Sequence, residues 1–412
     1  MRRTWQTVCA VSFLWVCSGL HAETGPSQGQ KCAWNLDALA RAPRVYPAPE
    51  FVTDGVRALF FEGLPYRGQP TRVFAWYGVP KTKAGERVPA MVLIHGGGGT
   101  AFAEWVSTWN ERGYAAIALD TNGGVPRKVG DAWARHAHSG PGEWGGFSQI
   151  DEPLGEQWTY HAVVDVILAN SLLRTFGEID PARIGVTGIS WGAYLTCIAA
   201  GVDDRFRIAI PVYGCGFLGD NSVWLKRFEL LGADHSAKWL ALWDPSRYLA
   251  GAGMPMLWVT GTNDPAYPLD SWRKSCRLPS GRRTLCVRVG MAHNHRQGRK
   301  PPEIQAFADR HLKAGPPLAQ ITAQGRAGSQ AWATYASHVP IVSAELNFTR
   351  DADEWRHRQW ETLPATVEPT PHTVRADLPD GVRVYYFNVT DRRGLVVSSE
   401  YRETDGAADG TG

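Results

Sequence analysis

The sequence predicts an α/β protein, in which a mostly parallel sheet carries helices on both faces, followed by a smaller all-β domain. Short apolar runs alternate with helical stretches between about residues 56 and 314, and such alternation implies a parallel sheet. After Gly315 the chain shows short alternating runs, several prolines and no helical period, which is typical of a β-sandwich. The expected domains are residues 23–315 and residues 316–403, with a disordered tail over residues 404–412.

Eight runs rich in β-branched and aromatic residues are the expected strands of the sheet. They cover residues 56–63, 71–79, 90–96, 114–120, 183–189, 207–214, 254–261 and 285–290. The central runs are apolar at consecutive positions, as strands covered on both faces should be. Helices are expected over residues 101–113, 157–176, about 190–200, and 301–315.

Two long insertions interrupt this alternation, residues 121–157 and residues 215–248. The first is rich in Gly, Trp and His, and the second is rich in Trp and Leu. Both follow the carboxyl ends of expected strands, which form the edge where open α/β sheets bind ligands. Because long loops in compact domains are often functional, we expect the insertions to border the functional site.

The first 22 residues are typical of a secretory signal peptide. Arg2 and Arg3 precede an apolar run over residues 8–19, and Leu-His-Ala before Glu23 resembles a small-residue cleavage site. The apolar run is too short to span a bilayer, and a buried N-terminal helix is the alternative. No later stretch is long and apolar enough to be a membrane span. The sequence therefore predicts a periplasmic or secreted protein.

Neither the net charge nor the cysteine spacing supports binding of nucleic acid or of zinc. The formal charge is +3 and falls to +1 once Arg2 and Arg3 leave with the signal peptide, so a nucleic-acid partner, which needs a basic face, has no support. The seven cysteines lack the spacing of a zinc site. Cys276 and Cys286 bracket a turn-rich segment, and they either form a disulfide in an oxidising compartment or remain two buried thiols.

The segment Gly-Ile-Ser-Trp-Gly, residues 188–192, has the G-x-S-x-G pattern of a nucleophile on a sharp strand-to-helix turn. Residues 184–187 read as the strand and residues 193–200 as the helix. The glycines allow tight packing of the backbone and leave the hydroxyl of Ser190 exposed above the sheet. Ser190 is the expected nucleophile, and a glycine-rich turn with a serine cap is the alternative reading.

A serine nucleophile needs a base and a carboxylate, which follow it along the chain in this pattern. Asp264 comes directly after the expected strand over residues 254–261 and is preferred to Asp270, which stands where a helix would begin. His293 and His295 both follow the last expected strand. His293 is the preferred base, and His295 remains the alternative.

The developing oxyanion needs two backbone N–H donors. One is expected from Trp191, the residue after the nucleophile, and the other from the glycine-rich loop His-Gly-Gly-Gly-Gly-Thr at residues 95–100. Gly97 or Gly98 is the expected donor in that loop, because glycine lets the backbone turn inward and approach a substrate.

These motifs together resemble the acetyl xylan esterase and dienelactone hydrolase-like group of α/β-hydrolases, over roughly residues 50–314. The matching segments are HGGGGT, GISWGA, GTNDPAYP and MAHNH. The resemblance implies an α/β-hydrolase fold and a serine esterase that forms an acyl-enzyme without a metal or an organic cofactor. Ser190 stands where true dienelactone hydrolases have cysteine, so their reaction does not carry over. The signal peptide and C-terminal β-domain resemble exported bacterial esterases of polysaccharide breakdown.

The chain contains 18 tryptophans, and several lie in the two insertions. Flat aromatic faces suit sugar rings as well as apolar acyl groups, and as a set these tryptophans favour a carbohydrate ester. Together with the resemblance they predict an esterase that removes acetyl groups from a carbohydrate, so that the expected substrate is a small-molecule or polysaccharide ester. The expected substrate-binding residues are Trp133, Trp144, Trp224 and Trp243. Packing anchors for the long loops are the alternative reading of these side chains.

Two other functions compete with the esterase prediction. One is a prolyl-oligopeptidase-like serine peptidase, which shares the G-x-S-x-G turn but carries an N-terminal propeller; only about 30 residues of the expected mature chain precede the first strand. The other is a hydrolase-fold scaffold that binds without turnover. The oligomeric state is not readable from the sequence.

Overall fold

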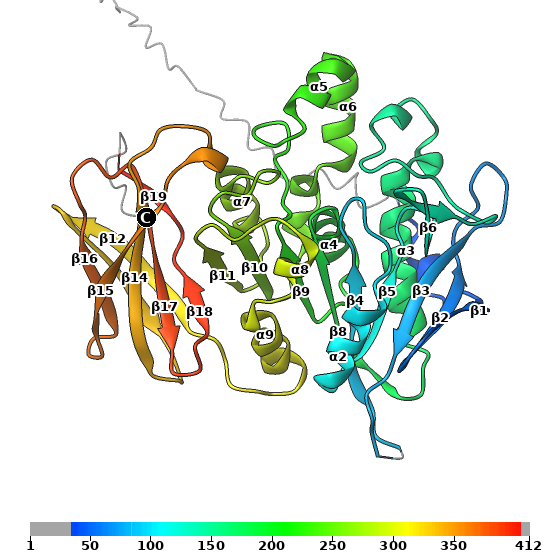
Figure 1. The fold of residues 1–412 in the computed structure, drawn as a ribbon, viewed down its shortest axis with the longest axis horizontal. Coiled ribbons are helices and arrows are strands. Elements are labelled where there is room, and N and C mark those ends of the chain that lie inside the picture. The colour runs from blue at the N-terminus through cyan, green and yellow to red at the C-terminus, as the bar shows by residue number, and fades with distance from the viewer. Residues whose placement is uncertain (1–33, 84, 405–412) are drawn as a thin grey trace, which may run out of the picture.

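The computed structural model describes residues 34–83 and 85–404. The predicted signal peptide lies outside the described residues, as do residues 405–412 of the predicted tail. Figure 1 shows a large α/β domain beside a smaller domain built of strands. The predicted fold class, an α/β domain followed by an all-β domain, is confirmed.

The larger domain is built on a nine-stranded sheet. Its strands, in sheet order, are β1 (Val45–Thr53), β2 (Val56–Glu62), β3 (Arg72–Gly78), β5 (Ala115–Leu119), β4 (Val88–Ile94), β8 (Ile179–Ile189), β9 (Ile208–Val212), β10 (Met256–Gly261) and β11 (Arg283–Arg288). Strands β1, β2, β3 and β5 pair antiparallel. From β5 to β11 every neighbouring pair is parallel. The carboxyl ends of these six strands therefore meet at one edge of the sheet.

Edge strand β1 was not predicted. Pro47 and Pro49 interrupt its sequence, and proline cannot donate a ladder hydrogen bond, which confines it to edge strands and irregular positions. The pairing of β1 with β2 shifts register between Pro47 and Val52. The eight predicted strands are all present, with ends that differ by a few residues.

Helices cover both faces of the sheet, as predicted. Helices α3 (Trp158–Leu173), α4 (Trp191–Val202) and α7 (Leu269–Cys276) pack in one apolar core, and helices α2 (Ala103–Glu111) and α9 (Pro302–Leu312) pack in another. Strand β4 contributes Val92 and Ile94 to the first core and Met91 and Leu93 to the second, because successive strand side chains point to opposite faces.

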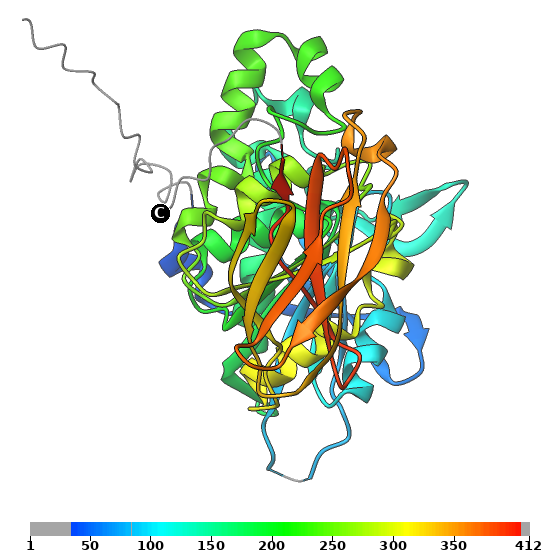
Figure 2. The ribbon, with the colours of Figure 1, turned by 90° about the vertical axis from the view of Figure 1, so that its left-hand side faces the viewer.

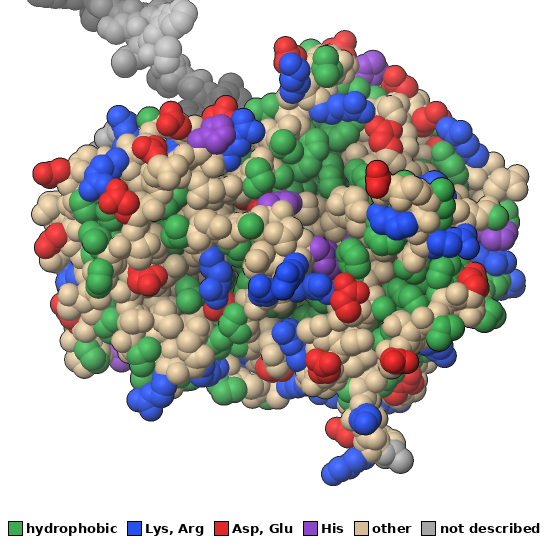
Figure 3. Space-filling model, in the orientation of Figure 1, with side chains coloured by type: hydrophobic (Ala, Val, Ile, Leu, Met, Phe, Trp, Pro, Cys, Tyr) green, Lys and Arg blue, Asp and Glu red, His purple; other side chains and the backbone are tan. Residues whose placement is uncertain are grey.

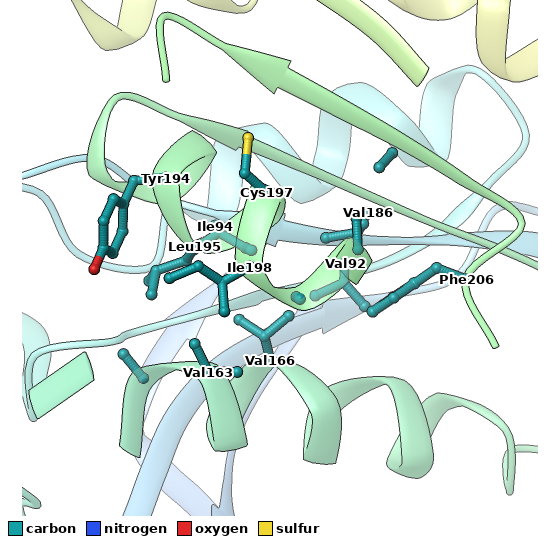
Figure 4. Packing of buried hydrophobic residues seen from close by; sticks show 14 of the residues in the cluster. Val92, Ile94, Val163, Val166, Val186, Tyr194, Leu195, Cys197, Ile198 and Phe206 are labelled. Carbon is teal, nitrogen blue, oxygen red and sulfur yellow. The ribbon is translucent and has the colours of Figure 1, made fainter. Parts of the chain in front are cut away.

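The core around α4 is close to the predicted serine turn. Figure 4 shows Val163 and Val166 of α3 directed toward α4, where Leu195 and Ile198 lie. Every residue of α4 is buried, and so is all but one residue of α3. Helix α4 is therefore held from both sides, which fixes its first turn at the carboxyl edge of the sheet.

The two insertions stand over this carboxyl edge. The first contains the hairpin β6 (Gly124–Val129) and β7 (Ala132–Arg135) and the short helices η2 (Phe147–Gln149) and η3 (Leu154–Glu156). The second forms α5 (Leu225–Leu231), α6 (Ala233–Trp243) and η4 (Pro245–Arg247), and η5 (Leu249–Gly251) follows it. Figure 1 shows α5 and α6 projecting together from the large domain. Two short helices complete the domain, α1 (Leu36–Leu39) and α8 (His295–Gly298).

The C-terminal domain is all-β, as predicted. Its strands are β12 (Gln320–Ala327), β13 (Gln330–Ala336), β14 (Ile341–Thr349), β15 (Glu361–Glu368), β16 (Thr373–Asp377), β17 (Val384–Asp391), β18 (Val396–Ser398) and β19 (Arg402–Glu403), with the short helix η6 (Trp355–His357) between β14 and β15. All pair antiparallel, and β15 pairs with β14 along its first half and with β16 along its second. Figure 2 shows the strands of this domain facing the viewer. The domain has an apolar core of its own.

The two domains meet along strand β11. The backbone N–H of Val287 donates to Ser398 Oγ at 2.7 Å, and the side chain of Asn388 donates to the Val287 carbonyl at 3.3 Å. The carboxylate of Glu303 in α9 accepts hydrogen bonds from the Arg288 guanidinium and from the backbone N–H of Val396. This polar seam places the C-terminal domain against the edge of the main sheet.

Cys276 and Cys286 do not form a disulfide. Both are free and buried, Cys276 at the end of α7 and Cys286 within β11. Burial raises the pKa of the Cys276 thiol to about 12 and also raises the pKa of the Cys286 thiol. Of the two readings of the sequence, buried thiols therefore hold. No helix in residues 34–83 or 85–404 is both long enough and apolar enough to cross a membrane.

Candidate active site

Ser190 lies on a strained turn between β8 and α4. Its backbone has φ 58° and ψ −120°, which non-glycine residues rarely adopt. A Cβ atom on Gly188 would lie 2.1 Å from the carbonyl oxygen of Gly192, and one on Gly192 would lie 2.0 Å from the carbonyl oxygen of Ile94. Only glycine allows this close approach, so the two motif glycines are required by the turn. The Ser190 N–H donates to the carbonyl of Val212 at 2.9 Å.

The structure brings Ser190, His293 and Asp264 into one hydrogen-bonded chain. His293 Nε2 lies 2.9 Å from Ser190 Oγ, and His293 Nδ1 lies 2.7 Å from Asp264 Oδ2. The other carboxylate oxygen of Asp264 accepts the backbone N–H groups of Ala266 and Tyr267 at 2.9 and 2.8 Å. Since an ionised carboxylate only accepts, Nδ1 carries the proton and Nε2 is free to accept the serine hydroxyl.

Two tyrosines that the sequence analysis did not single out flank the imidazole of His293. The ring of Tyr213 lies 4.7 Å from it, and the ring of Tyr267 is stacked on it at 6.3 Å. The Tyr213 hydroxyl donates to the carbonyl of Ala292 at 2.8 Å and so restrains the loop that carries His293. Both tyrosines follow strand ends, β9 and β10, which was the available sequence signal.

The alternative base and the alternative acid lie elsewhere. The His295 ring packs against Phe102 at 4.3 Å and Trp105 at 4.8 Å, and burial lowers its pKa to about 3. Asp270 stands in the first turn of α7 and accepts the side chain of Asn221 at 2.9 Å. Both residues serve packing and helix structure, whereas His293 faces Ser190 and Asp264 faces His293.

The two expected oxyanion donors border the serine turn. Trp191 is the first residue of α4, and the N–H groups of a first helical turn have no acceptor within the helix. A Cβ atom on Gly97 would lie 2.7 Å from Cδ1 of Trp191, so the glycine loop passes directly beside it. Gly98 has φ +70° with open space around its Cα, and its carbonyl accepts Trp133 Nε1 at 2.9 Å.

A buried histidine that the sequence analysis named only as part of the motif holds the glycine loop in place. His95 is 1% exposed, and its Nε2 accepts the backbone N–H of Thr121 at 3.1 Å. Its Nδ1 therefore carries the proton and donates to the Gly96 carbonyl at 3.0 Å. Burial lowers the pKa of His95, which keeps the ring neutral. Asp120 Oδ1 in turn accepts the N–H groups of Asn122 and Gly124.

Two of the four predicted substrate tryptophans, Trp144 and Trp224, lie beside the serine turn, and we call this pair the aromatic wall. Trp224 is partly exposed and packs 4.7 Å from Trp191, and Trp144 packs 5.4 Å from His95. Figure 3 shows apolar side chains gathered in a hollow on this face, below the α5–α6 projection. The partly exposed Trp133 lies on hairpin strand β7, with the Lys128 ammonium 3.9 Å above its ring.

The prediction that Trp243 contacts the substrate is wrong. Its side chain is only 1% exposed, and its Nε1 donates to Gln157 Oε1 at 2.7 Å. The neighbouring Trp239 is also buried and donates to the Gly145 carbonyl at 2.7 Å. Both indoles tie the second insertion to the first, because each needs a partner for its N–H when it is buried.

A mostly parallel sheet with the serine on the turn between β8 and α4 is the architecture of an α/β-hydrolase. Within that class the predicted resemblance to the acetyl xylan esterase group is confirmed: the family model described as Acetyl xylan esterase (AXE1) matches residues 24–226. The matched span includes Ser190 and ends before Asp264 and His293.

Two solved acetyl xylan esterases share the fold. The enzyme from Paenibacillus sp. R4 is 19% identical with a TM-score of 0.55, and the match covers 70% of this chain and 95% of that one. Acetyl xylan esterase 1 from Thermoanaerobacterium sp. JW/SL YS485 is 16% identical with a TM-score of 0.52, covering 69% and 98%. An uncharacterized peptidase of Bacillus subtilis, YuxL, is 25% identical over 268 residues, or 58% of this chain. The chain spans only 37% of the length of that peptidase.

Proposed function

We propose that the protein is an exported serine esterase that hydrolyses carboxylic esters through an acyl-enzyme and removes acetyl groups from a carbohydrate. The observation that carries the chemistry is the hydrogen-bonded chain from Ser190 through His293 to Asp264. This arrangement supplies a nucleophile, a base and a carboxylate that orients the base. Export rests on the pattern of residues 1–22.

The geometry suits a two-step mechanism. Ser190 Oγ attacks the ester carbonyl while His293 Nε2 takes the hydroxyl proton, and Asp264 stabilises the imidazolium that forms. The oxyanion accepts the N–H of Trp191 and a second N–H, which we assign to Gly97. His293 then gives its proton to the departing alcohol. In the second step His293 deprotonates a water, which attacks the acyl-enzyme, and His293 returns this proton to Ser190 Oγ as the acid leaves.

The carbohydrate substrate rests on the aromatic wall and on the family match. Trp144 and Trp224 present partly exposed rings beside the serine turn, and a sugar ring stacks on such faces. Trp133 lies across the glycine loop, on the β6–β7 hairpin. The family that matches the first half of the chain is described as acetyl xylan esterase, which favours an acetyl group on a sugar hydroxyl.

A serine peptidase is the second candidate, favoured by the identity to the Bacillus subtilis peptidase. The same three side chains would cleave an amide, with His293 protonating the departing amine. The two functions differ in the substrate that is turned over, and not in the residues that act. A scaffold that only binds would show neither activity.

The test is turnover of esters and amides by the purified protein, by Ser190→Ala, and by Ser107→Ala as a matched control that removes a serine bonded within α2. The substrates are p-nitrophenyl acetate, p-nitrophenyl octanoate, acetylated xylan and a peptide p-nitroanilide. Release of acetate from the short ester and the polymer by wild type and Ser107→Ala, but not by Ser190→Ala, supports the proposal. Turnover of the anilide alone supports the peptidase, and no Ser190-dependent turnover supports the scaffold.

A further inference from the structure

The C-terminal domain reaches the residue directly before Asp264. The side-chain nitrogen of Asn263 donates to the carbonyl oxygen of Arg358 at 2.7 Å, and it lies 3.3 Å and 3.4 Å from the carbonyl oxygens of Arg356 and Trp355. These three carbonyls belong to η6 and the turn that follows it. One amide group thus joins the catalytic edge of the sheet to a segment more than 90 residues further along the chain.

The other end of the Asn263 side chain points back into the α/β domain. Its Oδ1 accepts the hydroxyl of Thr262 at 2.7 Å, and that hydroxyl oxygen in turn accepts the backbone N–H of Gly290 at 3.0 Å. Gly290 lies two residues after the end of β11 and three residues before His293. A single polar chain therefore connects the C-terminal domain to the loop of the acid and to the loop of the base.

The segment that receives Asn263 is itself well anchored. Trp355 is 7% exposed, and its ring lies 4.9 Å from the ring of Tyr401. The Arg358 guanidinium lies 3.8 Å over the Trp355 ring, and its Nε donates to the carbonyl of Asp353. Because this packing holds the three carbonyls in place independently of Asn263, they can fix the position of the Asn263 side chain.

We propose that Asn263 is a positioning residue, through which the C-terminal domain holds the Asp264 loop in register with His293. The inference rests on the proposed function, since Asp264 must orient a working base. The Asp264–His293 distance of 2.7 Å depends on the loop that starts at Thr262. A displacement of about 1 Å in a reacting group can lower a rate by about 100-fold. The C-terminal domain is therefore part of the catalytic unit.

The experiment compares Asn263→Ala with the wild type in ester hydrolysis and in labelling of Ser190 by a fluorophosphonate probe. We expect kcat and the labelling rate to fall about tenfold or more, with KM within about twofold, because no substrate contact is removed. Trp355→Ala should reproduce this defect from the other side of the contact. The fall in kcat of the double variant should be smaller than the product of the two single falls, because both substitutions act through one contact.

Arg277→Ala is the matched control for the domain seam. Arg277 pairs with Glu400 across the same seam but carries no bond to the loop of Asp264. We expect this variant to melt at a lower temperature and to keep the wild-type kcat and labelling rate. Thermal melts of all variants separate a loss of folding from a loss of positioning.

Two results would overturn the role of Asn263. One is a folded Asn263→Ala protein with wild-type kcat and labelling rate. The other is an Arg277→Ala protein whose kcat falls as far as that of Asn263→Ala, because the seam would then act only by holding the domains together. Failure of the proposed function is visible in the wild type alone: a protein whose Ser190 neither reacts with the probe nor turns over esters would remove both proposals.

Discussion

The imidazole of His295 lies 4.3 Å from the ring of Phe102 and 4.8 Å from the ring of Trp105, at the start of α2. His293, two residues earlier, faces Ser190 instead, with Nε2 2.9 Å from the serine oxygen. Both histidines follow the last predicted strand of the sheet, so their positions in the sequence do not separate them. Because His295 is packed against aromatic rings, His293 is the base of the proposed mechanism.

This relationship predicts opposite effects of two similar substitutions. His293→Ala should lower kcat for p-nitrophenyl acetate by at least about 10³-fold, because the serine loses its base. His295→Ala should keep kcat and lower the free energy of unfolding by about 1–3 kcal/mol, because it leaves a cavity against Phe102. Steady-state kinetics and denaturant unfolding of both variants check the pair. A loss of kcat in His295→Ala that matches that of His293→Ala would contradict the assignment.

The glycine loop predicts a difference between neighbouring positions. Gly97→Ala should lower kcat about 10²-fold, because its Cβ would press on Trp191 and displace the proposed oxyanion donor. Gly98→Ala meets open space, so its effect should be confined to about 1–2 kcal/mol of backbone strain at positive φ. Kinetics and thermal melts measure both. A larger kcat loss in Gly98→Ala would move the donor to Gly98.

The tryptophans of the second insertion should separate into two groups. Trp224→Ala should raise KM for acetylated xylan about fivefold, the loss of roughly 1 kcal/mol of stacking, with a smaller change for p-nitrophenyl acetate. Trp243→Phe should leave KM unchanged and lower the free energy of unfolding by about 1–3 kcal/mol, because Gln157 Oε1 loses its buried donor. An equal KM on the polymer for Trp224→Ala and wild type would remove Trp224 from the substrate site.

Acid should destabilise the protein partly through His295. Burial lowers its pKa from 6.5 to about 3, so between these values the unfolded chain binds a proton that the folded protein does not. The His295 contribution to stability is therefore complete above pH 6.5 and is lost as the pH falls toward about 3. Urea unfolding from pH 7 to pH 4.5 should show a slope that is smaller in His295→Gln, by up to ~1.4 kcal/mol per pH unit. Identical slopes would show that His295 does not titrate this way.

Asp165 should act in the opposite direction. It is buried on α3, and burial together with the neighbouring Asp120 raises its pKa well above 3.8. Its ionisation is therefore suppressed in the folded protein, and its presence lowers stability progressively as the pH rises above the unfolded value. Asp165→Asn should raise the melting temperature more at pH 8 than at pH 5. A gain that does not grow with pH would show that Asp165 ionises freely in the folded state.

The features that local chemistry controls could be predicted from the residues alone. The alternation of apolar strands with helical periods set the α/β architecture, because strands covered on both faces must be apolar throughout. Gly188 and Gly192 marked the serine turn. A Cβ atom at either position would lie about 2 Å from a backbone oxygen, so only glycine fits there. The HGGGGT loop was likewise marked by glycine.

Which side chains meet depends on how distant segments pack. The choice between His293 and His295 depended on a pocket formed by α2, and the burial of Trp243 depended on Gln157 in another insertion. The contact of Asn263 with Arg358 joins two domains across 95 residues. Such contacts arise from packing between distant segments, and neither composition nor spacing encodes their distances.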